Sequence, residues 1–258
     1  MQGRAKPSIQ GRWIFGGWMI EAMPIKRPGW VRRLWRLFTR AVALFLIISV
    51  VSTAVYAWAP VPVTWLMIER VFEGNWINKS WRSYENISPN LARAVIAAED
   101  AKFCEHRGYD WQAIEKAWKR NQKAKRIRGG STISNQTAKN VFLWPDRTYI
   151  RKGLEFYFTG LIELTWTKKR ILEVYLNVVE FGPGVYGAEA AAEAHFGKSA
   201  KDLTRREAAL LAAVLPNPIR WSASKPTGYI RSRAGTIQAR MNDVPDPTGD
   251  PCPRQPSK

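Results

Sequence analysis

The stretch SPNLARAVIAAEDAKFCEHRG, from Ser88 to Gly108, decides the fold. Ser88 before Pro89 is typical of a helix start, because a serine side chain caps free backbone N–H groups and proline fits the first helical turn. Small and apolar residues then recur at helical spacing as far as Glu99 and Asp100. We therefore expect a buried helix that ends in two carboxylic acids.

These two acids are unfavourable for the helix itself, because negative charge at a helix C-terminus opposes the helix dipole. A carboxylate beside alanines and Phe103 is disfavoured in its charged form, and this suits acid–base chemistry. Such a conflict with local stability often marks a working site. A solvated helix end with ordinary acids is the alternative that this stretch alone leaves open.

A second motif, RIRGGSTISNQTAKN, runs from Arg126 to Asn140. Two glycines before Ser131 predict a helix start with Ser131 as the cap, where free N–H groups can bind an anion. An ordinary glycine turn with a serine cap is the alternative, and the lysine spacing is not that of a P-loop. About one turn into the helix, one face carries three polar side chains: Gln136, Lys139 and Asn140.

A third segment begins with DRTYIRKGLEFYF at Asp146 and gathers cations around one acid, Glu155. Charge runs are usually solvated faces. Here the cations precede an aromatic helix, and this arrangement fits a phosphate pocket beside an apolar groove. The cations are Arg147, Arg151 and Lys152.

At these segments the sequence resembles the peptidoglycan glycosyltransferase family, the glycosyltransferase module of penicillin-binding proteins. The match covers roughly residues 88–218 and keeps six segments in the family's order. They are E-D-x-x-F-x-x-H-x-G from Glu99, G-G-S-T-I-x-x-Q-x-x-K-N from Gly129, R-K-x-x-E from Arg151, I-L-E-x-Y-L-N from Ile171, GVYGAEAAAEAHFGK and LTRREAALLAAVLPNP. The short N-terminal anchor, with no transpeptidase segment after the match, resembles the monofunctional members.

The sequence departs from the family pattern at two positions. Asn135 stands where glutamine is usual, and His195 stands where tyrosine is usual. Both replacements keep hydrogen-bonding ability, so we expect activity to be retained.

The resemblance implies a mainly α, lysozyme-like domain with one N-terminal transmembrane helix. The implied substrate is lipid II, a disaccharide-pentapeptide on undecaprenyl pyrophosphate, which is added to a growing glycan chain through inverted β-1,4 linkages. Glu99 would be the general base that deprotonates the acceptor 4-hydroxyl. Glu155 would assist at the donor, through the pyrophosphate or through a divalent ion such as Mg²⁺, although no firm metal site is expected.

The resemblance also implies which residues bind the substrate. Four cations would hold the pyrophosphate: Lys139, Arg147, Arg151 and Lys152. The remaining substrate-binding residues would be Asp100, Phe103, His106, Gly130, Ser131, Thr132, Gln136 and Asn140.

The uncharged run AVALFLIISVVSTAVYAWA, residues 41–59, is about 19 residues long, enough to cross a hydrocarbon core of roughly 30 Å. A cleaved signal peptide is the alternative, but Pro60 directly after Ala59 disfavours cleavage there. Four arginines precede the run and predict a cytoplasmic N-terminus by the positive-inside rule. They are Arg32, Arg33, Arg36 and Arg40.

This anchor defines the expected organisation of the chain. We expect a basic cytoplasmic arm over 1–40, a transmembrane helix over 41–59 and a membrane-proximal connector over 60–86. The glycosyltransferase domain is expected over 87–242, and a disordered proline-rich tail over 243–258. The protein would be single-pass in the bacterial inner membrane, with its catalytic domain in the periplasm.

Composition agrees with a membrane surface. The net charge is +19 and there are 13 tryptophans, so the chain should favour anionic lipid and the membrane interface. A lysozyme-like hydrolase or lytic transglycosylase is an alternative, but it has no use for the cationic cluster. A basic scaffold or nucleic-acid binder would spread its cations over one face and fits poorly with export, so no nucleic acid is expected. Proteins of cell-wall synthesis are expected as further partners.

The two cysteines, Cys104 and Cys252, stand far apart in the sequence, and Cys252 falls within the proline-rich tail. We therefore do not expect them to form a disulfide. The cysteines and the two histidines show no spacing typical of a metal cage.

Overall fold

The computed structural model describes residues 29–121, 130–146 and 148–252. This part of the chain is mostly helical, with three very short strands. The chain divides into two compact units, residues 1–46 and 47–258. The mainly α fold predicted from the sequence is confirmed.

Helix α1, Gly29–Tyr56, is the one helix of the described part that is long and apolar enough to cross a membrane. It begins earlier than the predicted span 41–59, so the four arginines lie within its first turns, and it ends three residues before Ala59. Only Ser49 and Thr53 are buried along it, and its apolar side chains are exposed. An exposed apolar helix of this length is suited to a membrane anchor.

The last two turns of α1 belong to the second unit and are hydrogen-bonded to it. The hydroxyls of Ser49 and Tyr157 lie 2.7 Å apart, and the indole N–H of Trp166 donates to the carbonyl of Thr53 at 2.8 Å. The guanidinium of Arg170 donates to the carbonyl of Tyr56 at 3.0 Å. The end of the apolar helix is therefore fixed to the body of the second unit.

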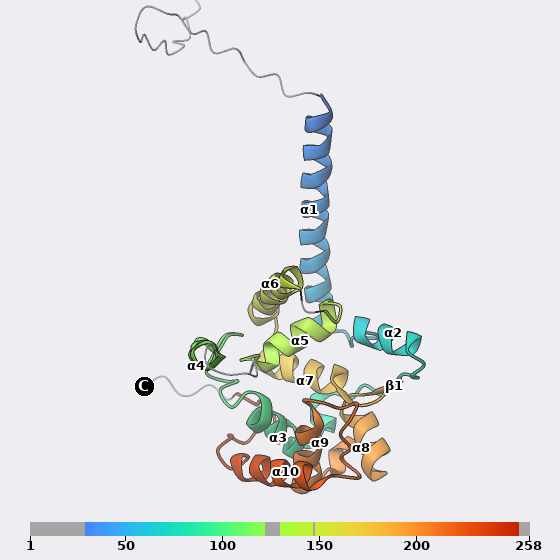
Figure 1. Ribbon diagram of the computed structural model, residues 1–258, viewed down its shortest axis with the longest axis vertical. Coiled ribbons are helices and arrows are strands. Elements are labelled where there is room, and N and C mark those ends of the chain that lie inside the picture. Colours follow the sequence, from blue (N-terminus) through green and yellow to red (C-terminus); the bar gives the residue numbers. More distant parts are fainter. Residues whose placement is uncertain (1–28, 122–129, 147, 253–258) are drawn as a thin grey trace, which may run out of the picture. The chain divides into compact units, whose positions relative to one another are not determined.

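One part of the core is formed by helices α3, Pro89–Glu99, α9, Arg205–Val214, and α10, Gly228–Arg240, which contact one another (Figure 1). The predicted start of α3 is confirmed, because the Ser88 side chain accepts from the backbone N–H of Asn90. Helix α9 begins with a capping box between Thr204 and Glu207. These caps satisfy N–H groups that the first helical turn leaves free.

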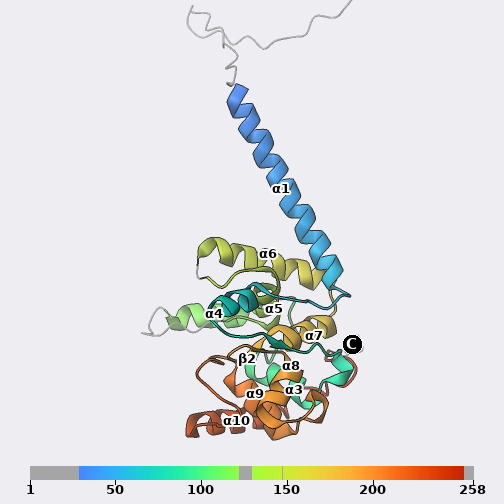
Figure 2. The same cartoon turned by 90° about the vertical axis from the view of Figure 1, so that its right-hand side faces the viewer.

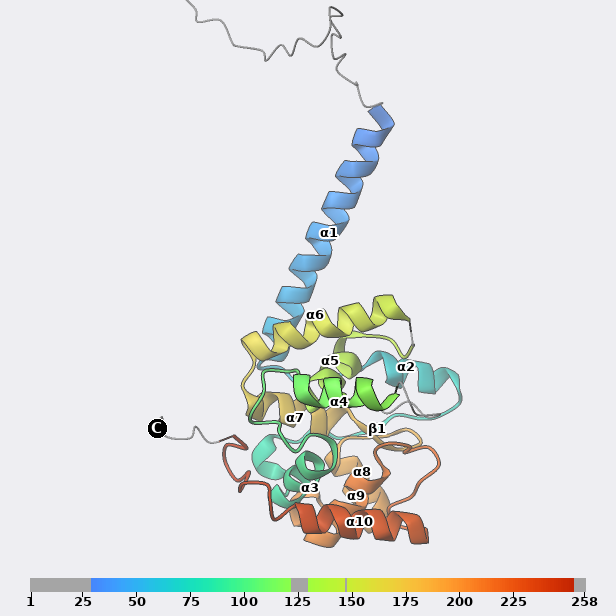
Figure 3. The ribbon, with the colours of Figure 1, turned by 60° about the vertical axis from the view of Figure 1, so that its left-hand side comes forward.

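The other part of the core is built on α5, Ile133–Phe142, which lies between α6, Tyr149–Thr165, and α7, Lys168–Val178 (Figure 2). Helix α4, Trp111–Asn121, lies at a level between α6 and α3 (Figure 3). Helices α3, α5, α6 and α7 carry the sequence motifs quoted above.

The remaining elements connect these two groups. They are α2, Trp65–Phe72; β1, Asn78–Lys79; the 3-10 turn Tyr84–Asn86; β2, Glu180–Gly182; β3, Val185–Tyr186; α8, Ala188–Phe196; and the 3-10 turn Ala200–Asp202. The strands form a sheet in the order β1-β3-β2, in which β3 pairs parallel with β1 and antiparallel with β2.

The expectation for residues 243–258 is wrong in the described part of the tail, up to Cys252. Every third side chain from Met241 through Val244 to Pro247 is buried, and Tyr84 donates its hydroxyl to the carbonyl of Pro247 at 2.8 Å. A proline-rich composition predicts disorder. Composition does not capture the order of the residues, and here every third residue is buried, a period unlike that of an α-helix or a β-strand.

A disulfide joins Cys104 and Cys252, contrary to the expectation from their separation in the sequence. The two Cα atoms are 5.2 Å apart although 148 residues separate them along the chain. The packed tail brings Cys252 back to the loop that follows α3. The disulfide therefore ties the tail to the segment directly after Glu99 and Asp100.

Candidate active site

Glu99 is the last residue of α3 and keeps partial access to solvent, with its side chain 16 % exposed. Its Oε2 accepts a hydrogen bond from Nε2 of Gln136 on α5 at 2.9 Å. Its Oε1 lies 3.9 Å from Nη2 of Arg233 on α10. Three helices thus converge on one accessible carboxylate, the arrangement expected of a general base.

Asp100 has a different role, because its carboxylate is buried and fully engaged by the protein. One oxygen, Oδ2, accepts the backbone N–H of Ile133 at 3.0 Å, and the carboxylate lies 2.9 Å and 3.1 Å from Nε2 of His106. A carboxylate at the start of α5 also complements the helix dipole. Asp100 therefore joins the end of α3 to the start of α5 and to the loop that contains His106.

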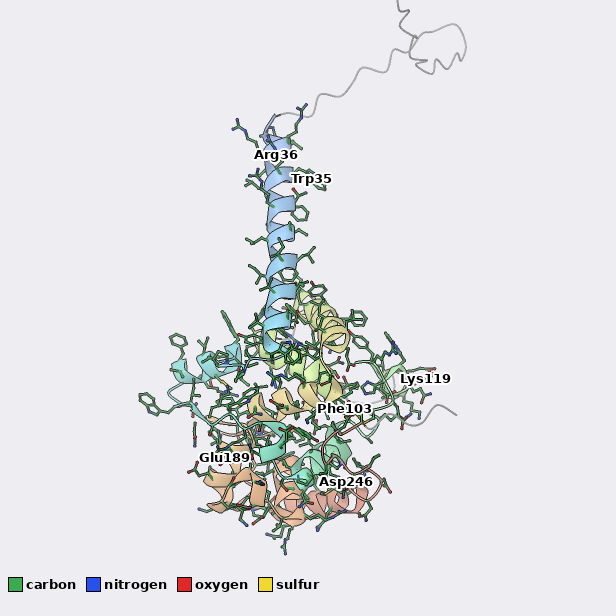
Figure 4. The ribbon with its side chains drawn as sticks, turned by 180° about the vertical axis from the view of Figure 1, so that it is seen from behind. Trp35, Arg36, Phe103, Lys119, Glu189 and Asp246 are labelled. Atoms are coloured by element: carbon green, nitrogen blue, oxygen red, sulfur yellow. A yellow bond between two sulfur atoms is a disulfide. The ribbon has the colours of Figure 1, made fainter. Side chains whose placement is uncertain are left out.

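Phe103 and His106 are interior side chains as well. Phe103 is completely buried, and the ammonium group of Lys168 lies 4.6 Å from the centre of its ring. Figure 4 shows Phe103 in the interior, whereas Lys119 points outward from α4. The His106 side chain is 8 % exposed. Asp100, Phe103 and His106 therefore help to hold this loop in place, and their predicted contacts with substrate stay a prediction.

The start of α5 differs from the sequence expectation. Thr132, not Ser131, is the cap, and its hydroxyl accepts from the N–H of Asn135 at 3.1 Å and donates to the carbonyl of Gly108 at 2.6 Å. The backbone N–H groups of Ile133 and Asn135 therefore already donate to Asp100 and to Thr132. A capped glycine turn, the alternative left open by the sequence, fits this helix start better than an anion site.

The other residues of this turn are placed as follows. Gly130 is half-buried beside the backbone of Ala113, and Ser131 is exposed. Gly108 has φ +86, and a Cβ there would lie 2.9 Å from Thr159, so a side chain at this position would be strained. Gly129 and Arg147 lie outside the described residues, so their predicted roles have no structural account.

Three residues of α5 form one polar face: Gln136, which contacts Glu99, Lys139, and the buried Asn140. Loss of hydration lowers the pKa of Lys139, whereas attraction to Glu155 and to Glu99 acts in the opposite direction. Both predicted catalytic acids therefore contribute to the electrostatic environment of Lys139.

Glu155 lies on α6 and is almost completely buried. Its Oε2 accepts from Nη1 of Arg151 at 2.8 Å, and its Oε1 accepts from Nζ of Lys152. The helical spacing of three and four residues places both cations on the face that carries Glu155. The Nε of Arg151 is buried and has no hydrogen-bond partner among the described residues. Two of the three predicted cations, Arg151 and Lys152, thus lie around this acid.

A cavity of about 430 Å³ opens next to this cluster. Lys139, Asn140 and Arg151 supply its polar wall, and Leu66 of α2 belongs to its apolar wall. The other lining residues are Leu143, Trp144, Pro145 and Asp146. Cations on one wall and apolar side chains on another suit an anionic group that is attached to a hydrocarbon chain.

The donor set around Glu155 does not fit a metal site built by the protein. Within the described part of the chain, no three His, Cys, Asp or Glu side chains gather in a way that could hold a metal ion. Both oxygens of Glu155 already accept from cations. A divalent ion here would have to take most of its ligands from substrate and water.

The two residues that depart from the family pattern, Asn135 and His195, differ in their surroundings. Asn135 is buried in α5, and its Oδ1 has no hydrogen-bond partner in the part of the chain that the structure describes. Burial lowers the pKa of His195, so its imidazole is neutral near pH 7, with Nε2 3.2 Å from the carbonyl of Phe181. A neutral His195 donating to that carbonyl keeps a hydrogen bond between α8 and β2.

Sequence reasoning missed Arg233, Leu66 and Tyr175. Tyr175 stands in the quoted I-L-E-x-Y-L-N segment, and its hydroxyl lies 3.2 Å from Oε1 of Gln136. No signal in the sequence indicated Arg233 or Leu66, because α10 and α2 lie outside the quoted motifs. Only the fold brings these helices to the site.

The fold and this pair of acids, one accessible and one ringed by cations, define an enzyme of glycosyl transfer. The family model described as "Transglycosylase" matches residues 67–242. The chain belongs to the transglycosylase family, whose domain is lysozyme-like.

Relatives named "Biosynthetic peptidoglycan transglycosylase" share about half of their residues with this chain. The protein from Caulobacter vibrioides is 54 % identical over 208 residues, which are 80 % of this chain and 91 % of the relative. The protein from Rhodospirillum centenum is 53 % identical over 82 % of this chain and 92 % of its own length. The protein from Pseudomonas aeruginosa is 50 % identical over 82 % of this chain and 94 % of its own length.

Proposed function

We propose that this chain polymerises lipid II into β-1,4-linked glycan strands for the bacterial cell wall. The relatives' shared name and the family match support this reaction. In the reaction, Glu99 takes the proton of the acceptor 4-hydroxyl, and that oxygen forms a bond to the anomeric carbon of the donor. The bond from this carbon to the pyrophosphate oxygen breaks, and undecaprenyl pyrophosphate leaves with the electron pair.

The observation that carries the proposal is the cavity that has Lys139 and Arg151 on its polar wall and Leu66 on its apolar wall. Negative charge grows on the pyrophosphate in the transition state, so fixed cations beside it lower the barrier. Arg151 and Lys152 already pair with Glu155, and the pyrophosphate would share these cations with that acid. Leu66 and Trp144 offer apolar surface to the prenyl chain.

This cationic wall favours a transferase over a hydrolase of similar fold. A lysozyme-like hydrolase also needs a glutamate in a helical cleft, but its leaving sugar carries no phosphate. A nucleic-acid binder is also disfavoured, because Arg151 and Lys152 are paired with a buried carboxylate and do not form an open basic face.

A divalent ion between Glu155 and the pyrophosphate remains a proposal, and no step is derived through it. Polymerisation with and without Mg²⁺ tests it, since loss of activity on chelation would require an ion held mainly by the substrate.

We further propose an inner-membrane location, with the N-terminus in the cytoplasm and the domain in the periplasm. The arginines in the first turns of α1 support this orientation. The disulfide between Cys104 and Cys252 supports an oxidising compartment. Exposed aromatic residues support contact with lipid: Trp58, Phe72 and Trp76 are 89 %, 88 % and 90 % exposed. Anionic lipid and proteins of cell-wall synthesis are the partners that this location implies.

The test of the proposed function is polymerisation of purified lipid II by the full chain and by Glu99→Gln. We expect Glu99→Gln to lower the rate at least about 100-fold, the size expected for loss of a general base, with lipid II binding largely retained. Glu193→Gln, a change at an exposed glutamate of α8, is the control and should leave the rate unchanged. Glycan strands made by Glu99→Gln at nearly the wild-type rate would show that Glu99 is not the base.

A further inference from the structure

A chain of three polar side chains leads from the interior of the domain to Glu99. The hydroxyl of Tyr175 on α7 lies 3.2 Å from Oε1 of Gln136 on α5. Nε2 of Gln136 lies 2.9 Å from Oε2 of Glu99 on α3. Each of the three residues comes from a different helix, so the chain connects three elements of the core.

The direction of these hydrogen bonds follows from their chemistry. A carboxylate can only accept, so the NH₂ group of Gln136 must face Glu99. The amide oxygen of Gln136 then faces Tyr175, whose hydroxyl donates to it. Burial raises the pKa of Tyr175 well above its usual range, with Glu99 and Asp100 adding to the effect, so the phenol stays protonated and remains a donor.

Tyr175 has no surface of its own to offer a substrate, because its side chain is completely buried. Without its hydroxyl, the amide oxygen of Gln136 would lose the donor that the described part of the chain gives it. A rotated amide would bring its oxygen toward the carboxylate of Glu99, and two acceptors repel each other. The orientation of Gln136 therefore depends on Tyr175.

We propose that Tyr175 is a positioning residue for the general base, a role that rests on the proposed function. Its hydroxyl fixes the amide of Gln136, whose N–H in turn holds Oε2 of Glu99. Oε1 of Glu99 is then the oxygen that takes the proton, since it lies 3.9 Å from the Arg233 guanidinium, beyond hydrogen-bond distance. Gln136 thereby acts on Glu99, in addition to its predicted place in the cleft.

The experiment measures initial rates of glycan formation against lipid II concentration for the full chain and for Tyr175→Phe. We expect kcat to fall roughly tenfold, the effect of one ordinary hydrogen bond, with KM changed less than about twofold. Tyr186→Phe is the matched control, because Tyr186 is equally buried and its hydroxyl bonds Glu180 at 3.3 Å, outside the proposed chain. It should lose stability in a similar way but keep its kcat.

A second arm tests whether Tyr175 acts through Gln136. In Gln136→Ala, adding Tyr175→Phe should lower kcat no further, because two residues of one chain are not additive. A further tenfold fall in the double variant would overturn the proposal, as would a Tyr175→Phe enzyme with unchanged kcat or with a raised KM alone. Should Tyr175→Phe not fold, Gln136→Met must lower kcat at unchanged KM, and a rise in KM alone would overturn the proposal.

Failure of this inference is distinguishable from failure of the proposed function. Wild-type enzyme that makes no glycan from lipid II contradicts the function itself. Wild-type enzyme that polymerises normally, together with a Tyr175→Phe variant that behaves like Tyr186→Phe, contradicts only the positioning role.

Discussion

The cations near Glu155 differ in how firmly they are held. Arg151 is buried against the carboxylate, whereas the Lys152 side chain is 57 % exposed and can turn toward a ligand. Because the side chain of Lys152 is largely exposed, its charge is available for an anionic substrate.

We expect Lys152→Ala to weaken binding of the lipid II donor, and to do so more at low salt. The Debye screening length is about 30 Å at 0.01 M salt and about 10 Å at 0.1 M, so an exposed charge attracts an anionic ligand more strongly in dilute buffer. KM for lipid II at several salt concentrations is the measurement. Lys119→Ala, which removes an exposed lysine of α4 paired with Glu115, is the control. A loss that does not vary with salt would speak against a pyrophosphate contact.

At the residue scale, the sequence could predict the chemistry of the site but not every partner. Glu99, Lys139 and Glu155 all stand in quoted motifs, and the structure places Lys139 on the same cavity as Arg151, which pairs with Glu155. Asp100 and Phe103 stand in the same motif as Glu99 yet are interior, because a motif also records residues that hold a loop in place. Arg233 reaches Glu99 only through the contact of α10 with α3.

Helix α2 extends the site beyond the quoted motifs. Thr64 caps it by accepting from the N–H of Met67 at 3.4 Å, and Met67 is completely buried, so one face of the helix is fixed against the domain. Leu66 lines the cavity, whereas Trp65 is 59 % exposed. The segment predicted as a membrane-proximal connector thus also supplies a wall of the candidate donor site.

We expect Leu66→Ser to lower kcat/KM for lipid II with a full-length prenyl chain by about three- to tenfold, from loss of about 1 kcal/mol of apolar contact. Lipid II carrying a short prenyl chain should be affected less. Val71→Ser changes an exposed residue of the same helix, 44 % exposed and outside the cavity lining, and is the control. Equal losses for both chain lengths would exclude a contact between Leu66 and the prenyl chain.

At the element scale, local signals were reliable where a helix cap needs only its own neighbours. The caps at Ser88 and Thr204 could be predicted because each bonds within its own first turn. The choice of Thr132 over Ser131 could not, since Thr132 also donates to Gly108, 24 residues earlier in the sequence. A distant partner decided between two adjacent hydroxyls.

The disulfide acts at the scale of the whole domain, because it joins the loop after α3 to the tail. Neither cysteine carries a sequence signal for the pair. Their approach depends on burial of Val244 and Pro247 along the tail, and on the hydrogen bond from Tyr84 to Pro247. Long-range contacts of this kind appear only in the folded chain.

We expect Cys104→Ser/Cys252→Ser to lower the free energy of unfolding by about 2–4 kcal/mol, since a long loop loses much entropy when it is cross-linked. Thermal unfolding of the variant and of the wild type, with and without reductant, is the measurement. The variant should not respond to reductant, and the reduced wild type should unfold near the temperature of the variant. A wild-type protein whose unfolding temperature does not change with reductant would contradict a stabilising role of the disulfide.

The hydrogen bonds at the end of α1 also bear on how a water-soluble fragment of the enzyme should be cut. A fragment that starts at Pro60 loses the backbone carbonyls to which Trp166 and Arg170 donate, and it uncovers Tyr157, because Ser49, Thr53 and Tyr56 are removed together. A fragment that starts at Ile47 keeps all three. Two turns of the apolar helix are in this sense part of the catalytic body, and solubility is better sought by replacing their exposed apolar side chains than by deleting them.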